Sequence, residues 1–257
     1  MKRVLFFLYG VASYAFFFVT FLYAIGFVGN ILVPKSVDTG FQAGTGNGWL
    51  IDIVLLSLFA VQHSVMARQG FKRVWTKVVP KAIERSTYVL FSTVALAAIF
   101  WFWRPLGGSV WEVGGNAGSA VLTGTYFLGW GVVLLGTFLV NHFNLFGLQQ
   151  VYLALRNREM TNPSFVRPLL YKIVRHPIML GFIIAFWATP AMTVGHLVFA
   201  FASTGYILVA IQLEEKDLVR FHGQEYIQYQ QEVSQIIPMP PRRRYTEGAA
   251  ARSQAGH

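Results

Sequence analysis

The chain has 257 residues, of which 54% are hydrophobic and 12% charged, and its formal net charge at pH 7 is +10. Because soluble domains are typically about 25% charged, this composition excludes disorder, a coiled coil and most cytosolic enzymes, and it indicates an integral membrane protein. No cysteine is present, which excludes disulfides, thiolate metal sites and a cysteine nucleophile. The excess of basic over acidic residues favours contact with the anionic lipid of a bilayer, and we expect no nucleic-acid partner.

Apolar segments follow one another along the chain. Four of them are close to the ~20 residues that a membrane-crossing helix needs, at about 4–31, 49–67, 86–103 and 122–140. After Pro177 the apolar run 178–189 spans ~18 Å as a helix, Pro190 interrupts it, and 193–213 is apolar again. We therefore predict an all-α integral membrane protein with about four transmembrane helices, a C-terminal helical hairpin and a cytoplasmic C-terminal helix.

Basic residues are concentrated in every second connection between these segments. Apart from Lys35 and Arg104, every Lys and Arg lies in one of four segments, at 1–3, 68–85, 141–177 and 214–257. The positive-inside rule places these segments on the cytoplasmic side of the membrane. We expect both termini and the active site there, in a bacterial inner membrane. The glycine-rich outer connections, 39–48 and 107–118, are expected to be simple turns without catalytic residues.

Polar side chains at membrane depth are candidates for function, because their burial is costly. One set, at 62–64, contains His63 near the cytoplasmic end of the second apolar segment, and another, at 141–150, follows the fourth. The alternative for both sets is structural, either a hydrogen-bonding cluster that positions helices or a solvated helix end. The candidates in the second set are His142, Asn144 and Gln149.

Charged residues flank the predicted hairpin. Arg175 and His176 precede Pro177, which suits a first helical turn, so they lie at a helix start that favours an anion. Glu214 and Glu215 follow the last apolar run, where negative charge opposes the helix dipole and requires a cationic partner. The alternatives are a positive-inside flank for the first pair and a solvated helix end for the second.

Two aromatic residues complete this pattern. Tyr226 and Tyr229 are three residues apart, so they share one face of a helix and are positioned to cover a flat aromatic ring or to pack together. A ligand with a carboxylate, a positive centre and an aromatic base would match the charged and aromatic sets in chain order. S-adenosylmethionine is such a ligand.

This order of residues resembles a known superfamily over about 171–238. The motifs that carry the resemblance are Arg175-His176-Pro177 with Gly181, Glu214-Glu215 with Leu218, Gly223 with Tyr226 and Tyr229, and Ile237-Pro238. Together they resemble the isoprenylcysteine carboxyl methyltransferase and phospholipid methyltransferase superfamily. The chain departs from it at 233–235, where Val-Ser-Gln replaces the usual Val-Pro-Arg, so the role of that arginine is unfilled.

The upstream segments 62–68, 84–88 and 142–148 resemble one branch of this superfamily, which contains methanethiol S-methyltransferases and NnrU-like proteins. The resemblance implies methyl transfer from S-adenosylmethionine to methanethiol, giving dimethyl sulfide. Other acceptors stay open: hydrogen sulfide, a larger thiol, a lipid amine or a prenylcysteine. A non-enzymatic NnrU-like role in transport or haem chemistry also stays open, with His63 and His142 as ligands.

The resemblance also implies a role for each matching residue. The amino-acid end of the cofactor would be held by Tyr171, Arg175 and His176 beside Gly181, its ammonium or ribose by Glu214 and Glu215, and its adenine by Tyr226 and Tyr229.

Because a free thiol is mostly protonated at pH 7, we also predict a base or hydrogen-bond acceptor. The candidates are His63 or His142, with Asn144 and Gln149 orienting the sulfur. No metal site is expected. We divide the chain into N-terminal transmembrane helices at 1–140, a methyltransferase core at 141–244 and a disordered tail at 245–257.

Overall fold

The computed structural model describes residues 1–40, 47–159 and 165–239, so the tail predicted at 245–257 lies outside the described residues. Within them, five helices are long and apolar enough to cross a membrane, namely α1 (Lys2–Gly29), α2 (Gly48–Ala67), α4 (Lys81–Phe102), α5 (Asn116–Val140) and α9 (Val194–His222). A shorter apolar helix, α8 (Pro177–Trp187), precedes α9. The predicted fold class, an all-α integral membrane protein, is confirmed.

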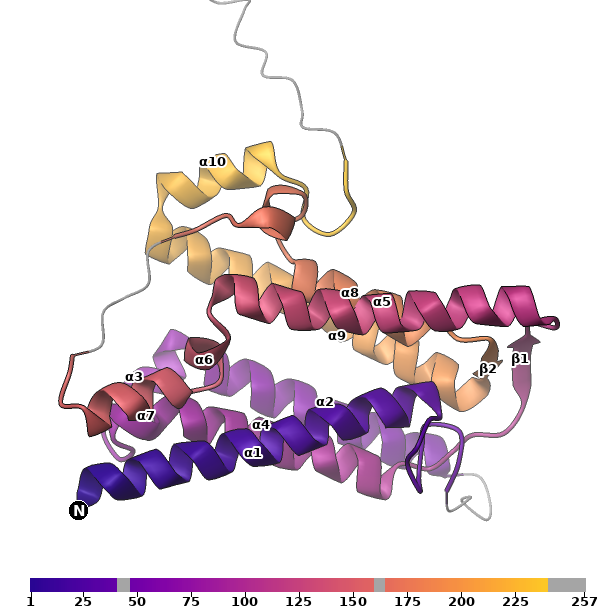
Figure 1. The fold of residues 1–257 in the computed structure, drawn as a ribbon, viewed down its shortest axis with the longest axis horizontal. Helices are drawn as coiled ribbons and strands as arrows, with labels where there is room; N and C mark the ends of the chain where they lie inside the picture. Colours follow the sequence, from indigo (N-terminus) through magenta and orange to yellow (C-terminus); the bar gives the residue numbers. More distant parts are fainter. Residues whose placement is uncertain (41–46, 160–164, 240–257) are drawn as a thin grey trace, which may run out of the picture.

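Short elements cap the two ends of this bundle (Figure 1). One end carries α3 (Gln69–Trp75), α6 (His142–Leu145), α7 (Leu148–Leu155), the 3₁₀ turn η1 (Leu169–Lys172) and α10 (Gln224–Glu232). The other end carries the strands β1 (Ser109–Glu112) and β2 (Ala191–Thr193), which pair antiparallel. Met1 lies at the same end as α10.

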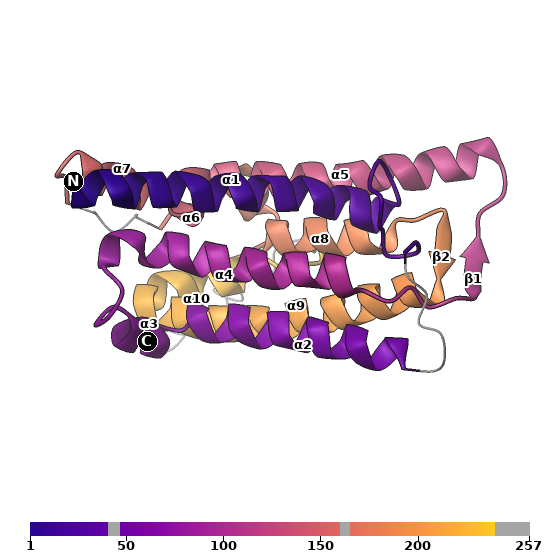
Figure 2. The same ribbon diagram turned by 90° about the horizontal axis from the view of Figure 1, so that it is seen from below.

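The long helices form two layers (Figures 1 and 2). In one layer α4 packs between α1 and α2, and in the other α5 packs closely along α8, with α9 alongside. Glycines allow the α5–α8 contact, because a Cβ atom placed on Gly181 would lie 2.6 Å from the carbonyl oxygen of Gly129. This close approach accounts for Gly181 without a ligand, and its predicted cofactor contact stays a prediction.

Two parts of the fold differ from the expected pattern. The helix α9 continues past the apolar run to His222, so Glu214 and Glu215 lie inside it instead of at its exit. It ends at Gly223, whose φ of 59° is costly for other residues. The outer connection around β1 is more than a simple turn, because β1 pairs with β2 in the hairpin bend after α8.

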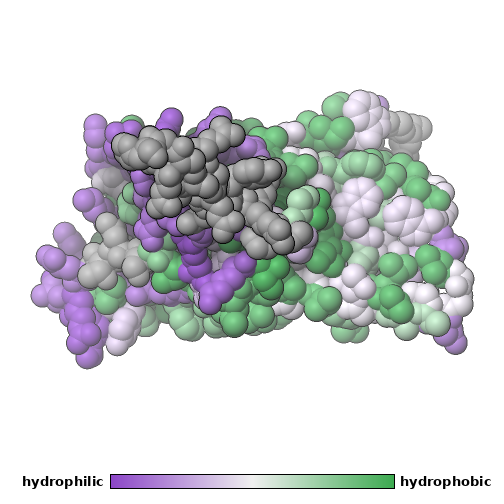
Figure 3. Space-filling model, turned by 90° about the horizontal axis from the view of Figure 1, so that it is seen from above, coloured by the Kyte–Doolittle hydropathy of each residue, from purple (hydrophilic) through white to green (hydrophobic). Residues whose placement is uncertain are grey.

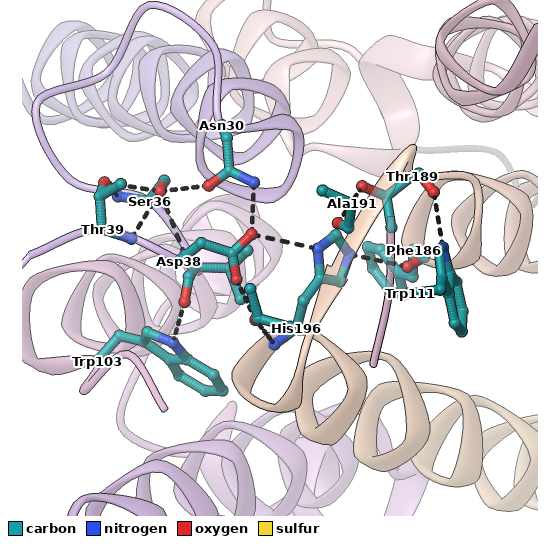
Figure 4. Close-up of polar contacts among 12 residues, drawn as sticks. Asn30, Ser36, Asp38, Thr39, Trp103, Trp111, Phe186, Thr189, Ala191 and His196 are labelled. Carbon is teal, nitrogen blue, oxygen red and sulfur yellow. Dashed lines mark hydrogen bonds and ion pairs between the residues drawn. The ribbon is translucent and has the colours of Figure 1, made fainter. Parts of the chain in front are cut away.

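A polar cluster joins the outer loop 30–39 to the start of α9 (Figure 4). Asp38 Oδ2 accepts a hydrogen bond of 2.6 Å from Asn30 Nδ2, and its other oxygen accepts one from the Thr193 hydroxyl. His196 is 1% exposed, and its Nε2 donates a hydrogen bond of 3.0 Å to Phe186 O, while its Nδ1 lies 3.7 Å from Asp38 Oδ2. The loop before the predicted turn 39–48 is therefore cross-linked to α9, while 41–46 of that turn lie outside the described residues.

Replacing Asp38 by asparagine is expected to destabilise this end of the bundle by about 1 to 3 kcal/mol, which lowers the melting temperature by several degrees. Burial alone would raise the pKa of Asp38, but the His196 ring and the hydrogen bonds from Thr193 and Asn30 lower it below its ordinary value. The stabilisation is therefore complete above the unfolded-state pKa near 3.9 and is lost as the pH falls through the lower folded-state pKa. Thermal unfolding in detergent checks both points, and exposed Glu112→Gln serves as the control.

Hydrophilic residues gather at the end of the molecule that carries α10, whereas apolar residues cover most of the rest of this face (Figure 3). Along α1 and α2 large apolar side chains are exposed, including Leu8, Val19, Leu58 and Val61. Lipid contact explains this exposure, because a soluble protein would bury such a continuous apolar face.

Candidate active site

A buried ion pair lies where α9 meets α10. Arg175 Nε donates to Glu215 Oε1 over 2.7 Å, and the two side chains are 8% and 9% exposed. Glu215 Oε1 also lies 3.0 Å from His176 Nε2, and its other oxygen accepts a 2.9 Å hydrogen bond from Gln230 Nε2. The guanidinium further donates to the backbone carbonyls of Gln230 and Val233. These groups neutralise and satisfy one another.

Local structure explains how these residues meet. Backbone N–H groups of Arg175 and His176 donate to the carbonyls of Ser234 and Gln235 over 2.8 and 3.1 Å, which fastens the segment after α10 beside the start of α8. His176 is the residue before the first turn of α8, and Pro177 begins that helix. The predicted juxtaposition of the Arg-His-Pro motif with the acidic pair is therefore present.

Glu214 stands in a different environment from Glu215. Adjacent residues on a helix point about 100° apart, so the two carboxylates face different sides of α9. The Glu214 side chain is 47% exposed, and the one possible cation within 4 Å among the described residues is His176 Nδ1, at 3.7 Å. His176 thus lies between the two carboxylates, and Glu214 keeps most of its charge uncompensated.

Glu214 lies within electrostatic range of several tyrosine hydroxyls. Its carboxylate acts electrostatically on four of them, those of Tyr88, Tyr171, Tyr206 and Tyr226. Burial raises the pKa of Tyr171 and Tyr226, and the negative charge of Glu214 adds to the rise. A carboxylate among neutral hydroxyls and aromatic rings suits a bulky cation that donates no hydrogen bond.

Two of the predicted adenine contacts form a packed aromatic cluster. Tyr226 and Tyr229 are each 2% exposed, their ring centroids are 5.7 Å apart, and Phe165 packs against both. Arg167 lies 4.7 Å from the Tyr229 ring centroid, and burial raises the pKa of Tyr229 to about 12. The Tyr229 hydroxyl donates to the backbone oxygen of Tyr171. In this arrangement the rings pack with each other, and their contact with adenine stays a prediction.

A groove of about 350 Å³ lies on the opposite side of α9 from Glu214. Its lining residues are Gln212, Glu215, Lys216, Val219, Arg220 and Gln230. Glu215 is the carboxylate of this groove, and it is already neutralised by Arg175. The groove is therefore a weaker candidate for a cationic ligand than the space beside Glu214.

His63 lies on α2 and contacts α4. Its Nε2 atom is 2.9 Å from the Tyr88 hydroxyl, and its Nδ1 atom is 3.1 Å from Ser92 Oγ. One position further along α2, Ser64 Oγ lies 3.2 Å from the hydroxyl of Tyr206 on α9. Because Glu214 acts on both tyrosines, His63 belongs to the same polar region.

The set at 141–150 forms a separate structural cluster. His142 Nε2 lies 2.8 Å from the Tyr14 hydroxyl, and Nδ1 lies 2.8 Å from Thr137 Oγ1, so both ring nitrogens are engaged. Its ring stacks on Phe138, and burial lowers its pKa. His142 therefore holds the end of α5 against α1, and no described contact joins it to Glu214.

The amides beside His142 serve the chain turn around α6. Gln149 Oε1 accepts a 3.0 Å hydrogen bond from Asn141 Nδ2, and the Asn144 N–H donates to Asn141 Oδ1 over 3.1 Å. The structural alternative thus explains this cluster, while the predicted catalytic roles of His142, Asn144 and Gln149 stay untested.

Tyr88, Ser92 and Tyr206 are site candidates to which the sequence analysis gave no role, although Tyr88 lies in the segment 84–88 that carries part of the resemblance. Each lies inside an apolar helical segment, where tyrosine and serine are usual packing residues. The available signal was helical spacing, because Tyr88 and Ser92 are four residues apart and share the face of α4 that contacts His63.

Known proteins were compared with the whole chain. A methanethiol S-methyltransferase of Mycobacterium tuberculosis is 55% identical over 94% of this chain and 99% of its own length. One from Crocosphaera subtropica is 51% identical over 93% of each chain. This chain belongs to the methanethiol S-methyltransferase family.

More distant relatives extend this family assignment. Nurim of Xenopus laevis is 29% identical over 73% of this chain and 67% of its own length. No family model and no solved structure matches the chain. Family membership makes the chain an integral membrane methyltransferase, which requires a methyl donor, and it decides against the non-enzymatic alternatives.

Proposed function

We propose that this enzyme transfers a methyl group from S-adenosylmethionine to methanethiol and releases dimethyl sulfide. The observation that carries this proposal is the identity of 49 to 56% to several methanethiol S-methyltransferases over most of the chain. The geometry supports it independently, since an uncompensated carboxylate, Glu214, lies close to a histidine network within a lipid-exposed bundle.

The residues around Glu214 fit S-adenosylmethionine by their chemistry. The ligand is cationic at its sulfonium and ammonium groups, and Glu214 is the acidic residue of the 214–217 set that keeps its charge available. Glu215 is paired with Arg175 at 2.7 Å, and Asp217 is paired with Arg68 at 2.8 Å. When bound, the cofactor supplies a methyl group on a positively charged sulfur, so the carbon needs no further activation.

Each group of residues then has a distinct task. Glu214 and His176 hold the cationic part of the cofactor, and the Arg175–Glu215 pair fixes the position of His176. Tyr171, Tyr226 and Tyr229 form the aromatic side of the site and exclude water from it. His63 accepts the proton that the thiol gives up, while His142, Asn144 and Gln149 shape the adjoining chain turn.

The division of the chain at residue 140 is proposed to separate two roles. The segment 1–140 supplies the thiol side of the site through α2 and α4, and 141–244 supplies the cofactor side. The basic loops at 68–85 and 141–177 support a site at the cytoplasmic face of a bacterial inner membrane, on the same side as both termini. A small apolar thiol dissolves in lipid and enters laterally, whereas the charged cofactor arrives from water.

Purified enzyme in lipid nanodiscs, mixed with S-adenosylmethionine and methanethiol, is expected to release dimethyl sulfide into the headspace, as measured by gas chromatography. A competition series with hydrogen sulfide, larger thiols, a lipid amine and a prenylcysteine tests the acceptor. Preference for any of these over methanethiol would overturn the substrate assignment. Methyl transfer neither to methanethiol nor to any of these other acceptors would overturn the proposed reaction.

A further inference from the structure

The hydroxyl of Tyr88 is one end of a hydrogen-bonded chain between two helices, with His63 at its centre. Tyr88 is 7% exposed and lies on α4, and its oxygen is 2.9 Å from His63 Nε2 on α2. The other nitrogen of the His63 ring, Nδ1, is 3.1 Å from Ser92 Oγ, one turn further along α4. The Tyr88 oxygen also lies 3.2 Å from Nδ1, but it is closer to Nε2, so each nitrogen of the imidazole has a partner.

These contacts define how a proton can move. With the proton of neutral His63 on Nδ1, that N–H donates to Ser92 Oγ, and the Nε2 lone pair accepts from the Tyr88 hydroxyl. The Tyr88 oxygen then has lone pairs free to accept from a further donor. A thiol S–H is such a donor, although a weak one.

The surroundings of this chain match a meeting point of thiol and cofactor. Glu214 and Tyr206 on α9 act electrostatically on the Tyr88 hydroxyl, and the Arg85 guanidinium lies 5.0 Å from its ring centroid. Arg68, at the end of α2, and Arg85, on α4, act electrostatically on His63. These are the charged and titratable groups that face the pair from α2, α4 and α9.

The helix that carries His63 also borders the lipid. Val61 and Val65, on either side of His63 along α2, are 62% and 46% exposed on the outer surface of the bundle. The His63 ring stacks on Phe59 with centroids 5.3 Å apart, and Phe59 contacts Tyr206. A small apolar molecule in the bilayer thus meets the apolar outer face of α2, and His63 lies on the opposite face of that helix.

We propose that Tyr88 is a catalytic residue that takes the proton of the thiol substrate and passes its own proton to His63; this inference rests on the proposed function. The electron pair of the S–H bond stays on the thiol sulfur and forms the new bond to the methyl carbon. The electron pair of the bond that breaks, between the methyl carbon and the sulfonium sulfur of the donor, stays on that sulfur, and the donor leaves as a neutral thioether. The released proton ends on His63 Nε2, and Ser92 stabilises the imidazolium by accepting from Nδ1.

The test is Tyr88→Phe, which removes the hydroxyl and keeps the ring under Arg85. We expect kcat for methanethiol to fall about 100-fold at pH 7, with the affinity for S-adenosylmethionine unchanged by calorimetry. Raising the pH is expected to narrow the difference from wild type, because the fraction of free thiolate rises about tenfold per pH unit below the thiol pKa. A purely structural role for Tyr88 would leave the ratio of wild-type to variant rate constant with pH.

A second measurement needs no turnover. Adding methanethiol without cofactor is expected to shift the ¹⁵N signals of His63 in the wild type and to leave them unmoved in Tyr88→Phe. The matched control is Tyr9→Phe, because the Tyr9 hydroxyl lies 3.1 Å from Thr87 Oγ1, on the residue next to Tyr88, and outside the relay. Active wild type with an equally active Tyr88→Phe would overturn this inference alone, whereas an inactive wild type would overturn the proposed function.

Discussion

Glu215→Gln is expected to lower the free energy of unfolding by about 3 to 5 kcal/mol, the cost of leaving a buried charge without its partner. The side chains of Arg175 and Glu215 are 8% and 9% exposed, so water cannot replace the lost carboxylate at the guanidinium. The same change weakens the contacts of Gln230 and His176. Denaturation in mixed micelles with increasing SDS measures the loss.

One control, a double variant, separates charge burial from local damage. The double variant Arg175→Met and Glu215→Leu is expected to recover part of the stability, because it removes both buried charges. Recovery is incomplete, since the carbonyls of Gln230 and Val233 lose their donor. If the Glu215→Gln variant were as stable as the wild type, the Arg175–Glu215 ion pair would contribute nothing to holding α10 against α9.

The long helices could be predicted because the bilayer dictates their length. Four apolar runs near 20 residues, interrupted by charged or glycine-rich connections, correspond to α1, α2, α4 and α5 within a few residues. The end of α9 could not be predicted from hydropathy, because the charged stretch after Leu213 is made of good helix formers and the helix stops at Gly223.

The candidate site could be predicted in part. The costly charges Arg175, Glu214 and Glu215 were identified from their place near the membrane, and the structure brings their segments together. Which carboxylate is neutralised was not predictable, since it depends on the rotation of α9 against a segment 40 residues earlier in the chain. Tyr88 lay in the resemblance segment 84–88 but was given no role, because a tyrosine within an apolar helix has the composition of ordinary core.

The two neighbouring glutamates on α9 are therefore expected to affect different properties, Glu215 the stability of the fold and Glu214 the affinity for the cofactor. Glu214→Gln should leave stability within about 0.5 kcal/mol of wild type, because its side chain is 47% exposed and its nearest cation is 3.7 Å away. Its affinity for S-adenosylmethionine should fall about 10- to 100-fold, the equivalent of one hydrogen bond to a charged group. Isothermal titration calorimetry and a melting curve measure the two effects, and Glu225→Gln on exposed α10 is the control.

A comparison of two ligands shows which cation Glu214 holds. S-adenosylhomocysteine keeps the ammonium group and lacks the sulfonium charge, so a larger loss of affinity for S-adenosylmethionine places Glu214 beside the sulfonium. Equal losses place it beside the ammonium. Wild-type affinity in Glu214→Gln, combined with weak binding in Lys216→Gln or Arg220→Gln, would instead move the cofactor to the groove on the other side of α9. In that case Tyr88 and His63 would be too far from the methyl group to act on the same thiol, so the position of one carboxylate decides the geometry of the whole reaction.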